Sequence, residues 1–152
     1  AAGCPCDPGL ATYCTAKPNS CGQLPAIAWT GEPSVSQASG FVVSSSGARQ
    51  GKFGLLLYGA NGPAATPFDG GLLCVAGPRR GIALAATGGT PGPACDAAFA
   101  VDWNAFATGA AGGNPAAFLT SIGQPVHCQW WARDSVTAGS LLSDGLAYSV
   151  LP

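Results

Sequence analysis

The chain has 152 residues, the size of one domain that can bury its own hydrophobic core. Hydrophobic residues make up 47% of it and charged residues only 9%, well below the roughly 25% of an average globular protein. A net charge of -1, with no basic cluster larger than the pair Arg79 and Arg80, argues against nucleic acid as a partner.

The first 23 residues contain four cysteines and three prolines and show no sustained hydrophobic periodicity. This pattern predicts an irregular lead stapled by disulfides, followed by one β-sandwich domain over residues 24–152. Seven cysteines without paired metal-ligand spacing are typical of oxidising compartments. The chain also begins without methionine or a signal segment, as a processed protein does, so we expect it to be secreted, extracellular or at the cell surface.

Eight short apolar segments, separated by turn-forming residues, predict β-strands. They are residues 26–30, 40–46, 53–59, 71–76, 81–86, 97–103, 126–132 and 145–151. The segment 53–59 is apolar on both alternating faces, which indicates a central strand covered on both sides. We expect an all-β fold, an antiparallel β-sandwich of jelly-roll or Ig-like type with long Gly/Pro loops.

Two further features complete the outline of the fold. A short helix is expected at 104–111 or 114–122, where an asparagine could cap the first turn. No apolar run approaches the roughly 20 residues that span a bilayer, so membrane insertion is not expected.

Catalytic and metal sites find little support in the sequence. A serine hydrolase would have to use His127, the only histidine, and no G-x-S-x-G motif accompanies it. Paired carboxylates could come from a small set of acidic residues, but most of these lie in expected turns, where aspartate is common. They are Glu32, Asp102, Asp134 and Asp144. Calcium between Asp134 and Asp144 is less favoured than a turn network with Arg133, and we expect no metal and no cofactor.

The stretch HCQWWARD, residues 127–134, offers the best binding surface. Strand alternation places Val126, Cys128, Trp130 and Ala132 on one face of the segment and His127, Gln129, Trp131 and Arg133 on the other. The second face could bind a glycan, because a sugar ring stacks on tryptophan while its polar neighbours donate to hydroxyls. A structural role, with Trp131 beneath a loop, is favoured over a sugar platform, and which face is buried stays open.

Several motifs occur in order along the chain: PS-x-S-x-ASGFVVS, GLLLYG-x-NG-x-AATPF-x-GG-LCV, CQWWARD and LSDGL-Y-V. From about Tyr13 to the C-terminus the chain resembles a family of secreted domains abundant in planctomycete and related bacteria. The resemblance implies an extracellular β-rich module without an established enzymatic activity. Members often end in cysteine followed by proline, whereas Leu151 precedes Pro152 here.

The same resemblance implies a pairing of cysteines. It matches Cys14, Cys74, Cys95 and Cys128 to the family's cysteines and suggests bridges between Cys14 and Cys74 and between Cys95 and Cys128. Cys21 would then pair with Cys4 or Cys6. Because seven is an odd number, at least one thiol is free or joins another chain.

These observations predict a function without catalysis. We expect a secreted structural protein that self-assembles into an extracellular fibre, a filament or a surface layer, because low charge and exposed strand edges favour contact between copies. The alternative is a carbohydrate-binding or adhesion module that uses the Trp131 face.

Overall fold

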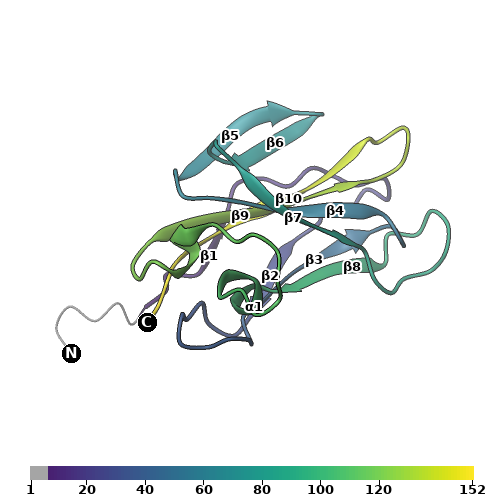
Figure 1. Cartoon of the computed structure of the whole chain (residues 1–152). Helices are drawn as coiled ribbons and strands as arrows, with labels where there is room; N and C mark the ends of the chain where they lie inside the picture. Colours follow the sequence, from purple (N-terminus) through teal and green to yellow (C-terminus); the bar gives the residue numbers. More distant parts are fainter. Residues whose placement is uncertain (1–6) are drawn as a thin grey trace.

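The computed structural model describes residues 7–152, which form an all-β protein with antiparallel sheets (Figure 1). The strands are β1 (Ala11–Tyr13), β2 (Ile27–Thr30), β3 (Val42–Ala48), β4 (Phe53–Gly59), β5 (Pro63–Phe68), β6 (Gly71–Val75), β7 (Arg80–Ala85), β8 (Ala97–Asp102), β9 (Pro125–Arg133) and β10 (Ser140–Ser149). One helical turn, α1 (Trp103–Ala107), and one 3-10 turn, η1 (Ala117–Thr120), follow β8.

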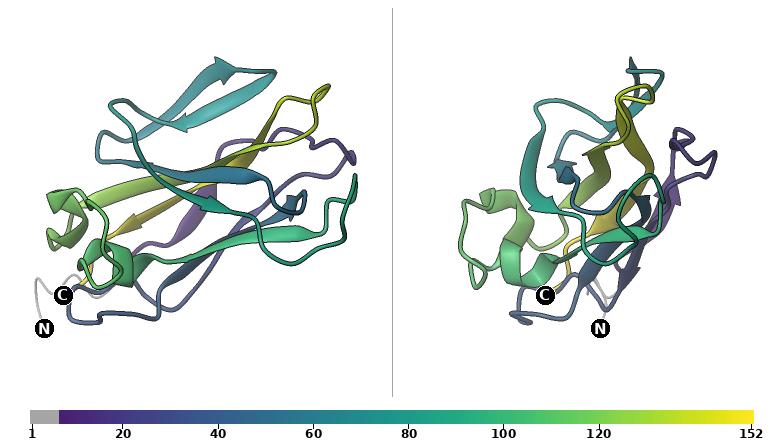
Figure 2. Two further views of the ribbon diagram at one scale, coloured as in Figure 1. Left: turned by 45° about the vertical axis from the view of Figure 1, so that its right-hand side comes forward. Right: turned by 90° about the vertical axis from the view of Figure 1, so that its right-hand side faces the viewer.

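The strands form three sheets that lie in layers. The largest sheet has five strands in the order β1-β10-β9-β4-β7, the second has the order β2-β3-β8, and the third is the hairpin β5-β6. In Figures 1 and 2 the five-stranded sheet lies in the middle, with the three-stranded sheet on one side and the hairpin on the other. All pairings within the sheets are antiparallel.

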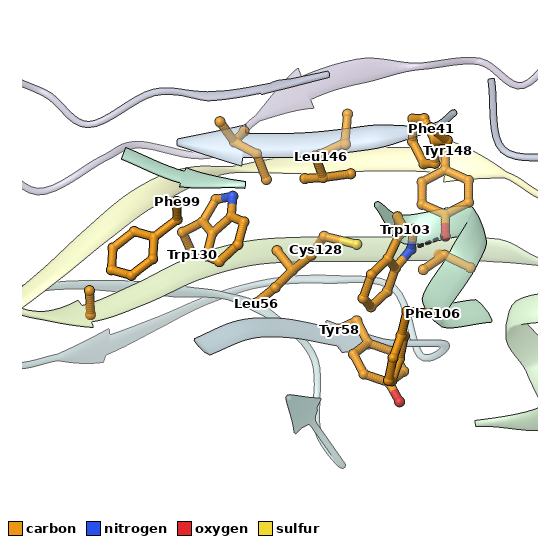
Figure 3. Close-up of a cluster of buried hydrophobic side chains, with 14 of the residues drawn as sticks. Phe41, Leu56, Tyr58, Phe99, Trp103, Phe106, Cys128, Trp130, Leu146 and Tyr148 are labelled. Carbon is orange, nitrogen blue, oxygen red and sulfur yellow. Dashed lines mark hydrogen bonds between the residues drawn. The ribbon is translucent and has the colours of Figure 1, made fainter. Parts of the chain in front are cut away.

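The hydrophobic core fills the space between the five-stranded and three-stranded sheets (Figure 3). Alternate residues of each strand point into it, as period-two patterning requires. Ile27, Val43 and Phe99 come from the three-stranded sheet, and Leu56 and Trp130 come from β4 and β9. The structure thus decides which face of each strand is buried, a point that the sequence pattern left open for residues 126–132.

Aromatic side chains close one end of the core. Asp102 caps α1, because its carboxylate accepts a hydrogen bond from the Ala105 amide at 3.0 Å. Trp103 then stacks on Phe106 and donates its indole N–H to the Tyr148 hydroxyl at 2.6 Å. The expectation that Asn104 would cap this helix is wrong: its side chain donates to the Glu32 carbonyl oxygen instead.

The hairpin β5-β6 was not expected as a strand pair. Its two-residue turn consists of Asp69 and Gly70, whose φ angles are +47° and +79°. Two residues with positive φ match the right-handed twist of a hairpin, and Asp-Gly is a preferred sequence for such a turn. The sequence of β5 does not indicate a strand because it contains Pro63 and Pro67, which are unfavourable in a central strand.

The N-terminal segment also differs from expectation, because it contributes β1 to the large sheet. Tyr13 lies opposite Gly145 of β10, and a Cβ on that glycine would come within 2.5 Å of the tyrosine ring. The missing side chain leaves room for the ring, whose hydroxyl donates to the Cys74 carbonyl oxygen at 2.6 Å. Residues 11–13 are therefore an ordered strand within the lead that we expected to be irregular.

The remaining predicted strands lie close to their expected positions. The range 53–59 coincides with β4, and β2, β3, β6, β7, β8 and β9 each overlap their predicted range. The last predicted strand, 145–151, begins too far along the chain. β10 begins at Ser140, so Asp144 lies in a strand rather than in a turn. No helix within residues 7–152 is long and apolar enough to cross a membrane.

Candidate functional site

Strand β9 separates the core from the outer surface of the large sheet. Val126, Cys128, Trp130 and Ala132 are completely buried against the core. His127, Gln129, Trp131 and Arg133 lie on the opposite face. The predicted alternation is confirmed, and the face that carries Trp130 is the inner one.

The inner face holds a free thiol. Cys128 is buried and unpaired, and burial raises the pKa of its thiol far above the usual value. The bridge expected between Cys95 and Cys128 is wrong, because Cys128 points into the core. Since a buried thiol cannot reach a neighbouring molecule, Cys128 also cannot link two chains covalently.

Two disulfides tie the N-terminal segment to the rest of the chain. The pair Cys14–Cys74 is confirmed. The second bridge joins Cys21 to Cys95, so the expected pairing of Cys21 with Cys4 or Cys6 is wrong. Cys4 and Cys6 themselves lie outside the described residues.

Gln129 is the most constrained polar residue of the outer face. Its side-chain oxygen accepts from the Cys74 amide at 2.9 Å, and its Nε2 donates to the carbonyl oxygens of Leu72 and Ser143 at 2.9 and 2.8 Å. The side chain is fully buried beneath β6. Gln129 therefore holds the hairpin onto the sheet and is not free to contact a ligand.

His127 lies against Tyr13, and within residues 7–152 its ring does not have the hydrogen-bond partners that a catalytic histidine needs. Its ring meets Tyr13 edge-on at 5.4 Å, and burial lowers its pKa below the usual value. Its Nδ1 is buried without a hydrogen-bond partner. Within residues 7–152 no hydrogen bond joins this ring to a serine or a carboxylate, so no Ser-His-Asp arrangement forms around it.

Trp131 remains half-buried and lies where two hollows meet. Its indole N–H donates to Ser140 Oγ at 3.1 Å, which fixes the ring against the start of β10. A polar hollow of about 320 Å³ lies on one side, lined by Lys52, Asp69, Trp131, Arg133, Asp134, Ser135, Val136, Gly139 and Ser140. An apolar hollow of about 240 Å³ lies on the other, lined by Leu55, Leu57, Phe68, Leu73, Arg79 and Trp131. We call these two hollows together the Trp131 groove.

The two acidic residues of the groove form hydrogen bonds and ion pairs with other residues of the protein. Asp69, at the tip of the hairpin, accepts a hydrogen bond from the Ser140 amide at 2.8 Å. This interaction, together with the charge of Lys17 at 3.9 Å, holds the pKa of Asp69 below its usual value. Asp134 is buried, accepts two hydrogen bonds from Ser20 and lies 3.5 Å from Arg49 Nε.

The basic residues at the rim are different. Lys52 and Arg133 line the polar hollow, and neither forms an ion pair within residues 7–152. The turn network expected between Arg133 and Asp134 is therefore wrong, because Asp134 pairs with Arg49 instead. The polar hollow presents two uncompensated positive charges beside a tryptophan.

The acidic residues considered for a carboxylate pair or a calcium site do not come together in one site. Asp144 accepts a hydrogen bond from the Ile27 amide at 2.8 Å, and burial raises its pKa. Asp134 has different partners, and Asp102 caps α1. Within the described part of the chain, no group of three or more His, Cys, Asp and Glu residues could hold a metal ion.

The sequence predicted that Trp131 and Arg133 lie on one face. It did not indicate that Lys52, Phe68 and Asp69 line the same groove. Lys52 precedes β4, whose residues pair with β9 near Trp131. Phe68 and Asp69 lie at the tip of the hairpin, which brings them to the groove. The Asp-Gly turn was the one signal that could have placed them there.

The fold and this surface define a small, disulfide-bonded all-β module with a groove on the outer face of its largest sheet. No protein-family model, curated protein or solved structure matches the chain. The similarity to secreted planctomycete domains accordingly stays a prediction.

Proposed function

We propose that the protein is a non-enzymatic, secreted structural module that self-associates through the free edge of β7. The two disulfides support an oxidising, extracellular location, because such bonds persist where thiols are not kept reduced. The observation that carries self-association is the unguarded backbone of this edge strand.

The order of the strands favours one of the two expected types of sandwich. Apart from β1 and the hairpin, seven strands remain, of which the first, second and fifth form β2-β3-β8. The seventh, sixth, third and fourth form β10-β9-β4-β7. Ig-like sandwiches divide their A, B, E and G, F, C strands in this way, and a fourth strand beside C occurs in the variable type. We therefore infer an Ig-like sandwich rather than a jelly roll.

The direction of the backbone groups of β7 follows from its neighbours. The Ala86 amide donates to the Lys52 carbonyl oxygen, toward β4. Since backbone groups alternate along an antiparallel strand, those of Gly81, Ala83 and Ala85 point away from β4. These three residues are exposed. They offer unpaired donors and acceptors to a partner strand.

From Gly81 to Ala85 this edge has no charged residue, proline or bulge. Natural edge strands are guarded by charged side chains, proline or bulges. Arg80 is the only charged residue of β7, and its guanidinium donates to the Asn114 carbonyl oxygen at the start of the strand. The strand is continuous from Arg80 to Ala85. A second copy of β7 is thus the partner we propose.

Ala83→Pro tests this proposal with little damage to the monomer. Its amide points away from β4, so proline removes a donor from the free edge and none from the β4-β7 ladder. We expect the wild type to form oligomers or filaments in sedimentation velocity and negative-stain microscopy. The variant should sediment as a monomer with an unchanged near-UV circular dichroism spectrum.

Ala83→Thr is the control, because it enlarges the same side chain but keeps the amide. It should assemble as the wild type does. A monomeric wild type, or assembly of Ala83→Pro equal to that of Ala83→Thr, would refute the role of this edge.

A second function, glycan binding, is favoured by the Trp131 groove. An aromatic face between a polar and an apolar hollow is the usual composition of a small-ligand site. Trp131→Ala should abolish binding on a glycan array or weaken it about tenfold, because a central aromatic contact contributes more than about 1 kcal/mol.

Trp29→Ala is the matched control for this test. Trp29 is also half-buried, but it lies on β2 of the other sheet, away from the groove. Glycan binding should survive this change. If Trp131→Ala retained full binding, or if it unfolded while the gentler Trp131→Phe bound normally, the ring would not be a sugar platform.

A further inference from the structure

The positive charges of the protein are gathered around the Trp131 groove. The chain has six Lys and Arg residues in total. Lys52, Arg133 and Arg79 line the groove, while Lys17 and Arg49 pair with its two aspartates. Three of the six basic side chains therefore line the groove and two more pair with its aspartates, although the whole chain carries a net charge of -1.

The balance of charge in this region is positive. Counted with the ion-pair partners of its aspartates, the groove has five basic groups and two acidic ones, Asp69 and Asp134, a local charge of 5 − 2 = +3 that Lys52, Arg79 and Arg133 carry. The other five acidic residues of the chain do not line either hollow. They are Asp7, Glu32, Asp96, Asp102 and Asp144. In a protein so poor in charge, this concentration gives the groove a preference for anions.

We propose that the Trp131 groove binds acidic sugars, that is, pyranose rings that carry a carboxylate or a sulfate. This inference rests on the second proposed function, glycan binding, and adds the chemical class of the ligand. The sugar ring would lie against Trp131, while its anionic group would be held by Lys52 and Arg133. The planar guanidinium of Arg133 suits two parallel hydrogen bonds to a carboxylate.

The two hollows favour a chain of sugars over a single ring. The volumes of the two hollows lie just above and below the lower end of the range for ligand sites, and Trp131 is common to both. Phe68 is 40% exposed and lines the apolar hollow, where it provides a second aromatic face. Arg79 also lines that hollow. One ring of an acidic oligosaccharide would thus occupy each side of Trp131.

The test compares an oligohexuronate with the same oligosaccharide after its carboxylates have been reduced to alcohols. We expect the acidic chain to bind the wild type at least about tenfold more tightly, as measured by titration calorimetry. The difference should shrink as salt is raised, because exposed charges are screened. A sulfated oligosaccharide forms a third arm and should also bind more tightly than the neutral chain.

Variants separate the groove from general electrostatics. Lys52→Gln and Arg133→Gln should each weaken binding of the acidic chain about tenfold and leave binding of the neutral chain unchanged. Arg80→Gln removes the one basic group that neither lines the groove nor pairs with its aspartates, with the same change in net charge. It should bind as the wild type does.

The outcomes distinguish this inference from the function on which it rests. Equal binding of the acidic and neutral chains, lost in Trp131→Ala, would overturn the preference for acidic sugars and keep glycan binding. An equal loss in Arg80→Gln and Arg133→Gln would overturn the assigned site. Failure of all three oligosaccharides to bind would overturn both.

Discussion

Replacing both Cys14 and Cys74 with alanine should lower the free energy of unfolding by about 4 kcal/mol. The bridge spans 60 positions of the sequence, and closing a loop of that size restricts the unfolded chain by about this amount. The bridge also joins the end of β1, which has no buried residue, to β6, in which only Cys74 and Val75 are fully buried. Denaturant unfolding of the double variant measures the loss.

The second disulfide provides the control. Cys21–Cys95 spans 74 positions, so its removal should cost a similar free energy. Only loss of Cys14–Cys74, however, should speed hydrogen exchange in residues 63–75, where the bridge holds the hairpin. A loss below about 1 kcal/mol, or identical exchange in the two double variants, would show that the hairpin does not depend on this bridge.

Short apolar segments between turn-forming residues were enough to predict most strands, because buried strands carry apolar residues on one or both faces. The predicted range coincides with β4, which lies inside the large sheet and is apolar on both faces. This signal failed for β1 and β5, whose residues are mostly exposed. These two elements are held by Tyr13, Cys14 and the Asp69-Gly70 turn, features that act through single residues.

The site was harder to predict because it depends on the hairpin. Period-two alternation placed Gln129 and Trp131 on one face, but it could not show that β6 covers the first and leaves the second half-buried. The cysteine pairing taken from the resemblance failed for a related reason. Cys128 shares its face with Trp130, and the packing of the two sheets decides that this face is inside.

Gln129→Ala should lower the free energy of unfolding by about 3 kcal/mol. The side chain is completely buried, and its loss would leave the Cys74 amide and the carbonyl oxygens of Leu72 and Ser143 without their partner. Each buried polar group left unpaired costs about 1–3 kcal/mol, and the cavity adds to this cost. The change should show as a lower denaturation midpoint. Gln37→Ala, on an exposed loop, should change stability by less than about 0.5 kcal/mol.

Gln129→Met separates the hydrogen bonds from the volume, because methionine fills a similar space without the amide. If hydrogen bonding holds the hairpin, Gln129→Met should be destabilised nearly as much as Gln129→Ala. Both should then lose glycan binding, since Phe68 and Asp69 reach the Trp131 groove only through the hairpin. Wild-type stability of Gln129→Met would show instead that packing alone keeps the hairpin on the sheet, and the groove would survive loss of the amide.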